Sequence, residues 1–301
     1  MKPSLSWDEQ VSLLVSRGLG IDNERECAEF LSVHNYYRFS GYMRYFQIAP
    51  HHGDDNFVHG TTLDQIRALY DADQVLRSAL TEQLTTAELL LRTHTAHVIA
   101  NDHGPCGHYL RADFYSDASS SEPTVESCLR DIERSRERHI LRYAVPGDRV
   151  PDFGELPVWS AVEAWSFGTL SKCIERGAQG TLADAVASSL GVAKAGFAYR
   201  VRALVYMRNR CAHHSRIWNH SIIDAGPTPN NVRVKAKHIA GQFEPRSALD
   251  VIASLDNIVD RGKAGLHMLP TLVEAHKQHA DFWKGLSHPQ NPQDHRQRPS
   301  R

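Results

Sequence analysis

The longest regular hydrophobic pattern in this chain runs from residue 62 to residue 100. Leucine, isoleucine and tyrosine recur there at steps of three and four residues, which places them on one face of an α-helix. Thr62 and Gln65 form a capping box, so the helix should begin at Leu63. The pattern continues to about Ala100 with at most one break. We therefore expect one long helix as the main support of the middle of the protein.

The same kind of pattern predicts shorter helices on both sides of the long one. Ser6 and Glu9 form another capping box, the helix that they open should end near Gly18, and Asp22 should cap the next helix. A short extended piece is expected around residues 57–58. The later helical segments are residues 124–143, 158–171, 181–190, 194–208 and 245–285. Together these elements predict an all-α protein.

Composition divides the chain into three regions. Residues 1–60 form an N-terminal helical region, and residues 61–285 form the core together with the C-terminal helices. Within the core, residues 101–123 are rich in Gly, Pro, Asp and Ser and predict a surface insertion loop. A second turn-rich loop leads into residues 232–234, for which a short hairpin is one interpretation. Residues 286–301 contain no apolar side chain after the first residue, and we expect this tail to be disordered.

Charge is unevenly distributed along the chain. The whole protein has a formal net charge of −1, which is no sign of general nucleic-acid binding. Between Arg200 and Ala240, however, eight Lys and Arg side chains stand against one acid, Asp224, so eight minus one gives a local charge of +7. Such a patch is typical of proteins that bind a phosphate-rich partner, although a solvated surface can collect the same residues. RNA is therefore a candidate partner.

The cysteines and histidines do not predict a disulfide or metal framework. The five cysteines are scattered without a Cys-x-x-Cys pair, and the eighteen histidines are dispersed. The start of the chain has no apolar signal region, and no apolar run approaches the roughly 18 residues of a membrane span. We expect a reduced, cytoplasmic protein with no cofactor, no metal and no membrane partner.

Three acidic side chains stand in positions that call for a cationic partner. Asp73 with Arg77, and Glu88 with Arg92, are spaced i,i+4 on the long helix. Exposed pairs of this kind contribute roughly 0.3–0.5 kcal/mol and are the default interpretation of both. Glu88 lies among leucines, so partial burial and a positioning role are the alternative. Glu163 is the one acid of an apolar segment and must face water or find a cation, because burying it unpaired is costly.

An aromatic stripe lies in residues 35–46, with six aromatic side chains and two arginines. Aromatic rings interleaved with arginine can stack on nucleic-acid bases. More often such a stripe belongs to the core, with hydroxyl and guanidinium groups at its rim. We favour the core interpretation.

Residues 207–219 concentrate polar side chains directly after an apolar run. Asn209 and His213 are four residues apart and would share a helix face. Arg208 and His213 are five apart and would diverge by about 140° on a helix. Arg208 can therefore act beside His213 only through its long stem, or if the helix ends or distorts there. His214 points about 100° away from its neighbour and is the poorer second catalyst.

A cluster of Arg, Asn and His suits metal-independent cleavage of RNA. A histidine with a pKa near 6.5 can take a proton from a ribose 2′-hydroxyl or give one to the leaving oxygen, and an arginine stabilises the charge of the transition state. The reaction uses an acid and a base, whereas one motif supplies one well-placed histidine, His213. A second chain related by a twofold axis would supply the other, so a homodimer is expected.

The motif and its context resemble known proteins. Arg208-Asn209-x-x-x-His213 is similar to the Arg-Asn-x-x-x-His signature of HEPN domains, helical bundles of which many are ribonucleases. The chain as a whole resembles the Abi-like family of bacterial abortive-infection proteins, over roughly residues 5 to 220. The matching stretches, in order, are residues 10–18, 35–38, 41–42, 66–77, 88–93, 156–159, 163, 166–168 and 208–219.

This resemblance implies an all-α protein with a HEPN-type helical bundle core and additional N-terminal and C-terminal helices. It also implies defence against phage, with RNA as substrate or partner. Arg208 and His213 would be catalytic, and Asn209 would orient them. The supporting polar residues would be Glu163, Glu88 and Arg92. The residues expected to hold RNA or to fix the site are Arg210, His214 and Arg216.

We therefore expect a cytoplasmic, homodimeric ribonuclease of a phage-defence system that is normally held inactive. Unrestrained RNA cleavage would kill the host, so a regulatory RNA or an occluded site should restrain it. The first alternative is a non-catalytic RNA-binding or regulatory protein of a defence or toxin–antitoxin-like system. The second is a protein-interaction module unrelated to RNA.

Overall fold

A computed structural model describes residues 4–119, 122–145, 152–223, 225–265, 267–276 and 279–294 of the protein. Helices dominate this part of the chain, and two short strands form an antiparallel pair, so the predicted all-α class is confirmed. The helices are α1 (Trp7–Ser16), α2 (Glu24–His34), α3 (Tyr36–Met43), α4 (Leu63–His103), α5 (Thr124–Arg134), α6 (Arg138–Leu141), α7 (Val158–Ala164), α8 (Phe167–Arg176), α9 (Leu182–Leu190), α10 (Phe197–Ala212), α11 (Asn230–Ala240), α12 (Ala248–Arg261), α13 (Met268–His276) and α14 (Ala280–Ser287). The strands are β1 (Gln47–Ala49) and β2 (Asp54–Phe57).

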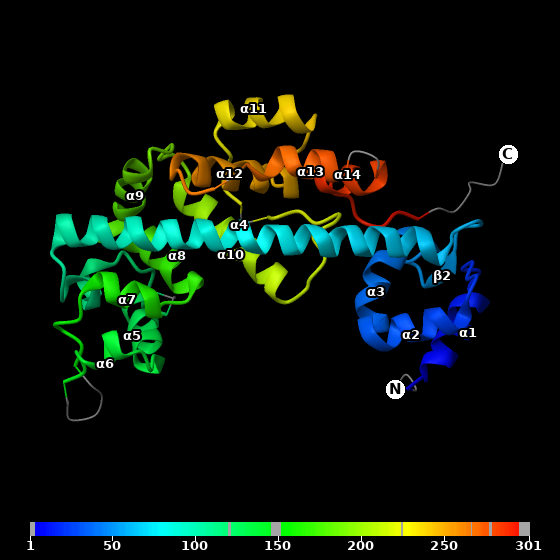
Figure 1. Ribbon diagram of the computed structural model, residues 1–301, viewed down its shortest axis with the longest axis horizontal. Helices are drawn as coiled ribbons and strands as arrows, with labels where there is room; N and C mark the ends of the chain where they lie inside the picture. Colours follow the sequence, from blue (N-terminus) through cyan, green and yellow to red (C-terminus); the bar gives the residue numbers. More distant parts are fainter. Residues whose placement is uncertain are drawn as a thin grey trace.

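Helix α4 is the predicted long helix, and it extends along nearly the whole molecule (Figure 1). The capping box forms as expected, because the Gln65 N–H donates to the Thr62 hydroxyl at 3.3 Å and the Gln65 side chain accepts from the Thr62 N–H at 3.2 Å. The helix has 41 residues and passes Ala100 without a break. At about 1.5 Å per residue it is roughly 60 Å long, so it connects the two ends of the fold.

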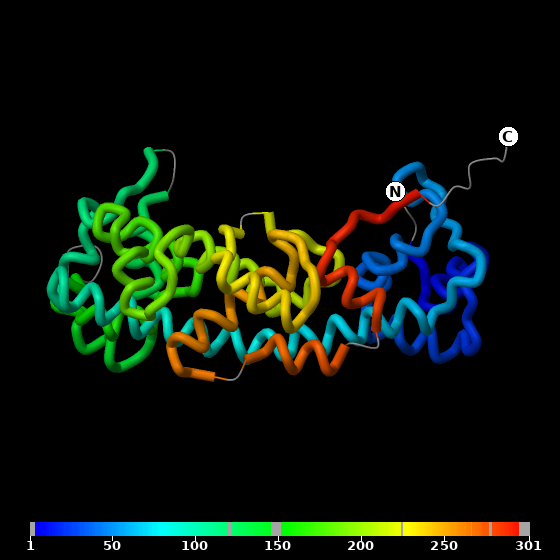
Figure 2. The backbone as a smooth tube through the Cα atoms, turned by 90° about the horizontal axis from the view of Figure 1, so that it is seen from above, coloured from blue at the N-terminus to red at the C-terminus, as the bar shows by residue number. Residues whose placement is uncertain are grey.

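The other elements are grouped along α4. The first three helices and the two strands lie at one end, and α5 to α9 lie at the other (Figures 1 and 2). Helices α10 and α12 pack against α4 and against each other, and α13 and α14 follow along it. Buried apolar side chains form one continuous core through these layers. The result is an arch in Figure 1, with the end of α10 on its concave side.

The N-terminal caps agree with the sequence in one case and differ in the other. At α1 the Glu9 N–H donates to the Ser6 hydroxyl at 3.3 Å, as predicted. At α2 the cap is Asn23 rather than Asp22, because the Asn23 Oδ1 accepts from the Glu26 N–H at 3.1 Å. Asn23 stands three residues before that amide, which is the spacing that an N-cap side chain can reach.

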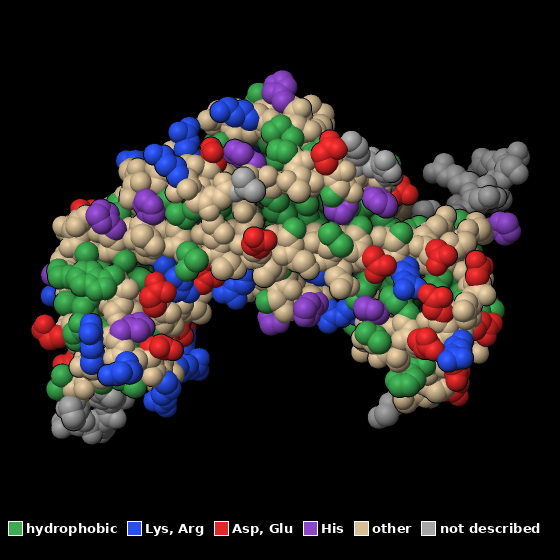
Figure 3. Space-filling view, in the orientation of Figure 1, with side chains coloured by type: hydrophobic (Ala, Val, Ile, Leu, Met, Phe, Trp, Pro, Cys, Tyr) green, Lys and Arg blue, Asp and Glu red, His purple; other side chains and the backbone are tan. Residues whose placement is uncertain are grey.

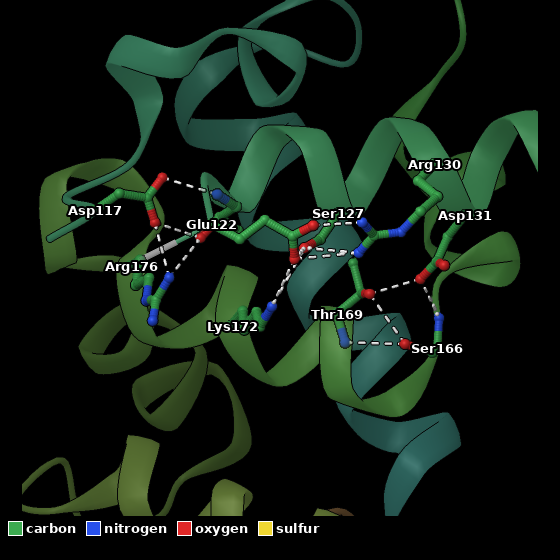
Figure 4. Close-up of polar contacts among 10 residues, drawn as sticks. Asp117, Glu122, Ser127, Arg130, Asp131, Ser166, Thr169, Lys172 and Arg176 are labelled. Carbon is green, nitrogen blue, oxygen red and sulfur yellow. Dashed lines mark hydrogen bonds and ion pairs between the residues drawn. The ribbon is translucent and has the colours of Figure 1, made fainter. Parts of the chain in front are cut away.

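The apolar segment 158–171 forms two helices instead of the single predicted one. The chain is extended at Trp165, with a ψ of 138°, and a new helix then begins. Ser166 caps α8 by accepting from the Thr169 N–H at 3.1 Å. Asp131 of α5 accepts from the Ser166 N–H at 2.9 Å and from the Thr169 hydroxyl at 2.5 Å (Figure 4). These side-chain bonds satisfy the first turn of α8 and separate it from α7.

Two other predictions about elements need correction. Residues 124–143 form α5 and α6, with an extended residue, Ser135, between them. The hairpin considered at residues 232–234 does not form, because this stretch lies within α11. Ala236 and Ala240, one helical turn apart, are buried on one side of α11. Packing of this buried face stabilises a helix in a segment for which the local sequence suggested a turn.

The insertion at residues 101–123 is more than a surface loop. Its first three residues complete α4, and both Tyr109 and Tyr115 are buried. The Tyr109 hydroxyl donates to the backbone carbonyl of Leu156 at 2.6 Å. Residues 120–121 lie outside the described residues. The aromatic side chains therefore fasten most of this segment to the end of the molecule formed by α5 to α9.

The first half of the tail predicted to be disordered is held against the N-terminal region. The Tyr45 hydroxyl donates to the backbone carbonyl of Gln290 at 2.9 Å, and the Gln290 N–H donates to the Asn219 side chain at 3.0 Å. The sequence predicts disorder from residue 286 onward, whereas residues 288–294 follow a path that these hydrogen bonds hold. Residues 295–301 lie outside the described residues.

No helix in the described part of the chain combines the length and the apolar character that a membrane span needs. Helix α4 exceeds the length of a bilayer span, but charged side chains recur along it. Its length serves instead to carry the two end groups of the arch.

Candidate functional site

Helix α10 ends inside the polar stretch that the sequence singles out. Its last residue is Ala212, and His213 is the C-cap, with φ −89° and ψ 9°. His214 has a φ of 53°, in the left-handed region that redirects the chain after a helix. Arg208 and Asn209 therefore lie on the helix, whereas both histidines lie on the turn that follows. Of the two geometries that the spacing allowed, a helix ending at the motif is the observed one.

Arg210 and Arg216 stabilise the turn after α10. The Arg210 Nε donates to the Arg216 carbonyl at 3.0 Å, and its Nη1 donates to the Tyr206 hydroxyl at 3.3 Å. The Ser215 N–H donates to the Arg210 carbonyl at 2.8 Å. The Arg216 guanidinium lies 4.8 Å from the ring centroid of Tyr45. These contacts hold the turn, and the binding of RNA by the two arginines stays a prediction.

A buried ion pair anchors the end of the motif to α4. Arg77 Nη1 lies 2.6 Å from Oδ2 of Asp73, and the Asp73 side chain has no exposed surface. The Asp73 carboxylate also accepts from the N–H groups of Ile217 and Trp218, each at 3.0 Å, and from the Tyr42 hydroxyl at 2.5 Å. The default prediction of a surface pair is therefore wrong for Asp73 and Arg77. The segment after the motif folds over α4 and removes the pair from water.

Arg38 of α3 holds the same turn from another direction. Its Nη1 donates to the carbonyl of His213 at 3.3 Å and also to the carbonyl of His214. Carbonyls at a helix C-terminus lack helical partners and attract a cation, so this contact is favourable. Phe39 and Tyr42 on the same helix are buried, which agrees with the core interpretation of the aromatic stripe. Sequence reasoning missed the role of Arg38, although Arg38 lies in that stripe and in the matching stretch 35–38.

Glu88, Arg92 and Arg208 come together on the other side of α10. Arg208 Nε lies 3.7 Å from Oε2 of Glu88, and Arg92 Nη2 bonds the other oxygen of that carboxylate. Arg92 also donates to the carbonyls of Trp165, at 2.8 Å, and Val162, which ties α4 to the end of α7. The side chain of Glu88 is 18% exposed. Partial burial is thus confirmed for Glu88, and its positioning role stays a prediction.

The remaining predicted site residues are exposed. Asn209, His213 and Glu163 all face solvent. Within the described part of the chain, no hydrogen bond or ion pair involves the side chains of His213 and Glu163. The Arg208 guanidinium lies 5.6 Å from the ring centroid of Phe167 and so is directed toward α8. No hydrogen bond joins Arg208 to His213, so a single chain leaves these two groups unassembled.

The end of α10 lies in the hollow of the arch. Figure 3 shows this hollow between the two end groups, with His, Lys and Arg side chains gathered at its middle. Among the described residues, no group of three or more His, Cys, Asp or Glu side chains is placed to hold a metal ion. The concave surface beside the motif is thus basic and rich in histidine, which suits a phosphate-bearing ligand.

His220, just beyond the motif, is held neutral. Its ring stacks on Tyr206 with centroids 5.7 Å apart, and a hydrogen bond of 2.7 Å joins its Nε2 and the Tyr206 hydroxyl. Burial, followed by the charges of Arg210 and Arg216, lowers the pKa of His220 from 6.5 to about 4. This histidine therefore supports the turn through the Tyr206 hydroxyl, which also accepts from Arg210.

We expect the free energy of unfolding to fall as the pH decreases from about 6.5 to about 4, in part because of His220. Between these values the unfolded chain protonates His220 while the folded chain does not, so the unfolded state binds more protons. His220→Gln should reduce this fall, measured by urea unfolding at both ends of the range. His238→Gln, at an exposed position of α11, is the matched control. An identical fall in wild type and His220→Gln would contradict the assignment.

The fold and the motif together define an all-α protein with a polar turn fixed at the end of a core helix. The family model described as Abi-like protein matches residues 29–219, which is more than half of the chain. The chain therefore belongs to the Abi-like protein family, whose description points to abortive infection and thus to defence against phage. The match includes Arg38, the Asp73 anchor and the whole motif. No curated protein and no solved structure matches the chain.

Proposed function

We propose that the protein is a metal-independent endoribonuclease of the HEPN type that acts in phage defence in the bacterial cytoplasm. The observation that carries the proposal is the position of His213, exposed on a firmly held turn in a basic hollow, with Arg208 on the helix just before it. Asp73 and Arg38 hold that turn from two sides. A fixed backbone under an exposed histidine is suited to acid–base chemistry, because catalytic groups must be positioned before the substrate binds.

The proposed reaction is internal attack within RNA. One histidine takes the proton of the ribose 2′-hydroxyl, the 2′-oxygen bonds to phosphorus, and the bond from phosphorus to the 5′-oxygen breaks. A second histidine gives its proton to that leaving oxygen. The products are a 2′,3′-cyclic phosphate and a 5′-hydroxyl. Arg208 would bind the phosphate oxygens as negative charge builds up, and Asn209, one helical turn before His213, would orient its ring.

A second chain would complete the site. One chain offers one exposed His213, and its Arg208 points toward Glu88 and Phe167. A twofold axis through the hollow would bring two copies of the motif together, so that each copy of His213 faces the other. The exposed Glu163 of α7 would then lie near this interface. The composite site explains why a single chain leaves its catalytic groups apart.

The surrounding polar residues would hold RNA and the site. His214 is exposed and available to RNA, whereas Arg210 and Arg216 keep the turn in place through contacts already described. Glu88 and Arg92 would hold Arg208 until substrate competes for its guanidinium. Because uncontrolled cleavage would kill the host, a regulatory RNA or the Glu88 contact itself would keep the enzyme inactive.

A non-catalytic, RNA-binding or regulatory role in a defence or toxin–antitoxin-like system is the second candidate. The Arg208–Glu88 contact favours it, because a paired arginine is less able to stabilise a transition state. In this case the basic hollow would hold RNA without cutting it. RNA affinity without cleavage is the result that would distinguish this role.

The test is the chemistry of the cleavage products. The purified protein should cleave single-stranded RNA in EDTA, and mass spectrometry of the fragments should find 2′,3′-cyclic phosphate and 5′-hydroxyl ends. Arg208→Ala, purified in the same way, controls for contaminating nuclease and should lose most of the activity. Fragments with 5′-phosphate ends, or activity that EDTA abolishes, would exclude the proposed reaction. RNA binding without any fragments would favour the second candidate.

A further inference from the structure

A polar pocket lies beside the motif, where the α2–α3 junction meets α4 and the end of α10. Its volume is about 460 Å³. Pockets that take small ligands range from about 300 to about 1,000 Å³, so one nucleotide-sized ligand fits. The residues that line it include His34, Arg38, Tyr70, Ser78, Thr81 and His214.

The charge of this pocket favours an anion. None of its described lining residues is acidic, and Arg38 is an exposed cation at its edge. Only Nη1 of Arg38 is used on the carbonyls of the turn. Within the described residues, its Nε and Nη2 donate to nothing. These two N–H groups form the planar edge that binds two oxygens of one phosphate. The second lining arginine, Arg77, is already neutralised by Asp73.

The α4 side of the pocket offers hydrogen-bond acceptors. The Ser78 hydroxyl donates to the Gln74 carbonyl at 3.2 Å, and the Thr81 hydroxyl donates to the Arg77 carbonyl at 2.8 Å. With its hydrogen directed to that carbonyl, each hydroxyl oxygen can accept a hydrogen bond from a ligand. A bare phosphate dianion cannot donate to them, whereas a sugar hydroxyl can. A ligand with a phosphate at one end and a sugar at the other satisfies both sides.

An aromatic wall completes the pocket. His34 and Tyr70 are joined by a hydrogen bond of 3.0 Å between Nδ1 and the hydroxyl, and their ring centroids lie 5.2 Å apart. The two rings are nearly perpendicular, at 75°, and Tyr70 is buried, so it is the partly exposed ring of His34, held by this contact, that can stack on a flat base. Phosphate, sugar and base thus each find a matching group.

We propose that this pocket binds a phosphorylated nucleoside, with its phosphate on the free edge of Arg38 and its sugar against Ser78 and Thr81. Arg38 also holds the carbonyls of His213 and His214, so the ligand and the motif share one side chain. Occupancy of the pocket therefore affects the turn that carries His213. The ligand is either one unit of an RNA chain or a free nucleotide, and binding does not depend on cleavage.

Adenosine 5′-monophosphate and inorganic phosphate are the probes, titrated by calorimetry into the full-length protein. We expect the nucleotide to bind at least about tenfold more tightly than phosphate. Ser78→Trp fills the pocket from an exposed position of α4 and should abolish nucleotide binding. Val75→Trp places the same side chain at an exposed position of α4 outside the pocket lining and should leave binding unchanged. Arg38→Gln should weaken binding without filling the space.

Each outcome bears on the proposal. Equal affinity for phosphate and nucleotide, or unchanged binding in Ser78→Trp with its helical spectrum intact, overturns it. A single-stranded RNA hexamer, added to the His213→Ala protein so that it is not cut, identifies the source of the ligand. Displacement of the nucleotide by the hexamer assigns the pocket to RNA, and no displacement assigns it to free nucleotide. Because these measurements involve no cleavage, the pocket and the proposed ribonuclease can fail separately.

Discussion

Asp73→Ala should lower the free energy of unfolding by about 3–5 kcal/mol. The change leaves the Arg77 guanidinium buried without its anion, and it removes the acceptor of the Ile217 and Trp218 N–H groups. A buried charge without a partner and buried donors without an acceptor are both costly. Urea unfolding followed by circular dichroism measures the loss. We also expect the turn that carries His213 to become mobile, because its anchor to α4 is gone.

Asp71→Ala is the matched control for this prediction. Asp71 is on the same helix, its side chain is 56% exposed, and its cation, Arg67, lies 3.8 Å away. Exposed pairs of this kind contribute about 0–1 kcal/mol, so the control should lose little stability. If both variants unfold at the same urea concentration as the wild type, Asp73 does not anchor the motif.

His213→Ala should slow RNA cleavage by about 10²- to 10⁴-fold, the usual contribution of a general acid or base. The side chain is exposed and takes part in no hydrogen bond within the described residues, so the melting temperature should stay the same. His214→Ala removes the neighbouring histidine and should cause a much smaller loss. Equal losses in the two variants would contradict the assignment of His213.

Mixed dimers test whether the site needs both chains. When wild-type and His213→Ala chains are mixed equally and allowed to exchange, about a quarter of the dimers contain two wild-type chains. A composite site then predicts about a quarter of the wild-type rate at the same total concentration, whereas separate sites in each chain predict about half. Full activity in a strictly monomeric protein would also exclude the composite site.

Local features of the fold can be predicted because their causes lie within a few residues. The capping boxes at Ser6 and Thr62 and the unbroken course of α4 follow from side chains three and four positions apart. Such local reasoning places helix boundaries less well where side chains far away in the sequence also bond to the backbone. Residues 158–171 have one apolar pattern, yet the cap of Ser166 and its bond to Asp131, 35 residues away, begin a second helix.

The candidate site likewise combines features that the sequence predicts with features that depend on tertiary contacts. The residue types of the motif, its spacing and Arg92, the i,i+4 partner of Glu88, can be found in the sequence alone. Burial of Asp73 could not be predicted, because the groups that cover it are 144 and 145 residues away. The spacing that marks an exposed pair on one helix is identical when another segment folds over it, and burial then changes the pair from a marginal contact into an anchor.

The sequence by itself determined the helical class of this protein, its long central helix and the cluster of Arg208, Asn209 and His213. Only the tertiary structure decided that α10 ends at this cluster, that Arg208 faces Glu88, and that Arg38 reaches the turn from 175 residues away. The physical reason is that periodicity and capping act along the chain, whereas burial, helix termination by outside partners and the walls of a pocket depend on which segments meet in space.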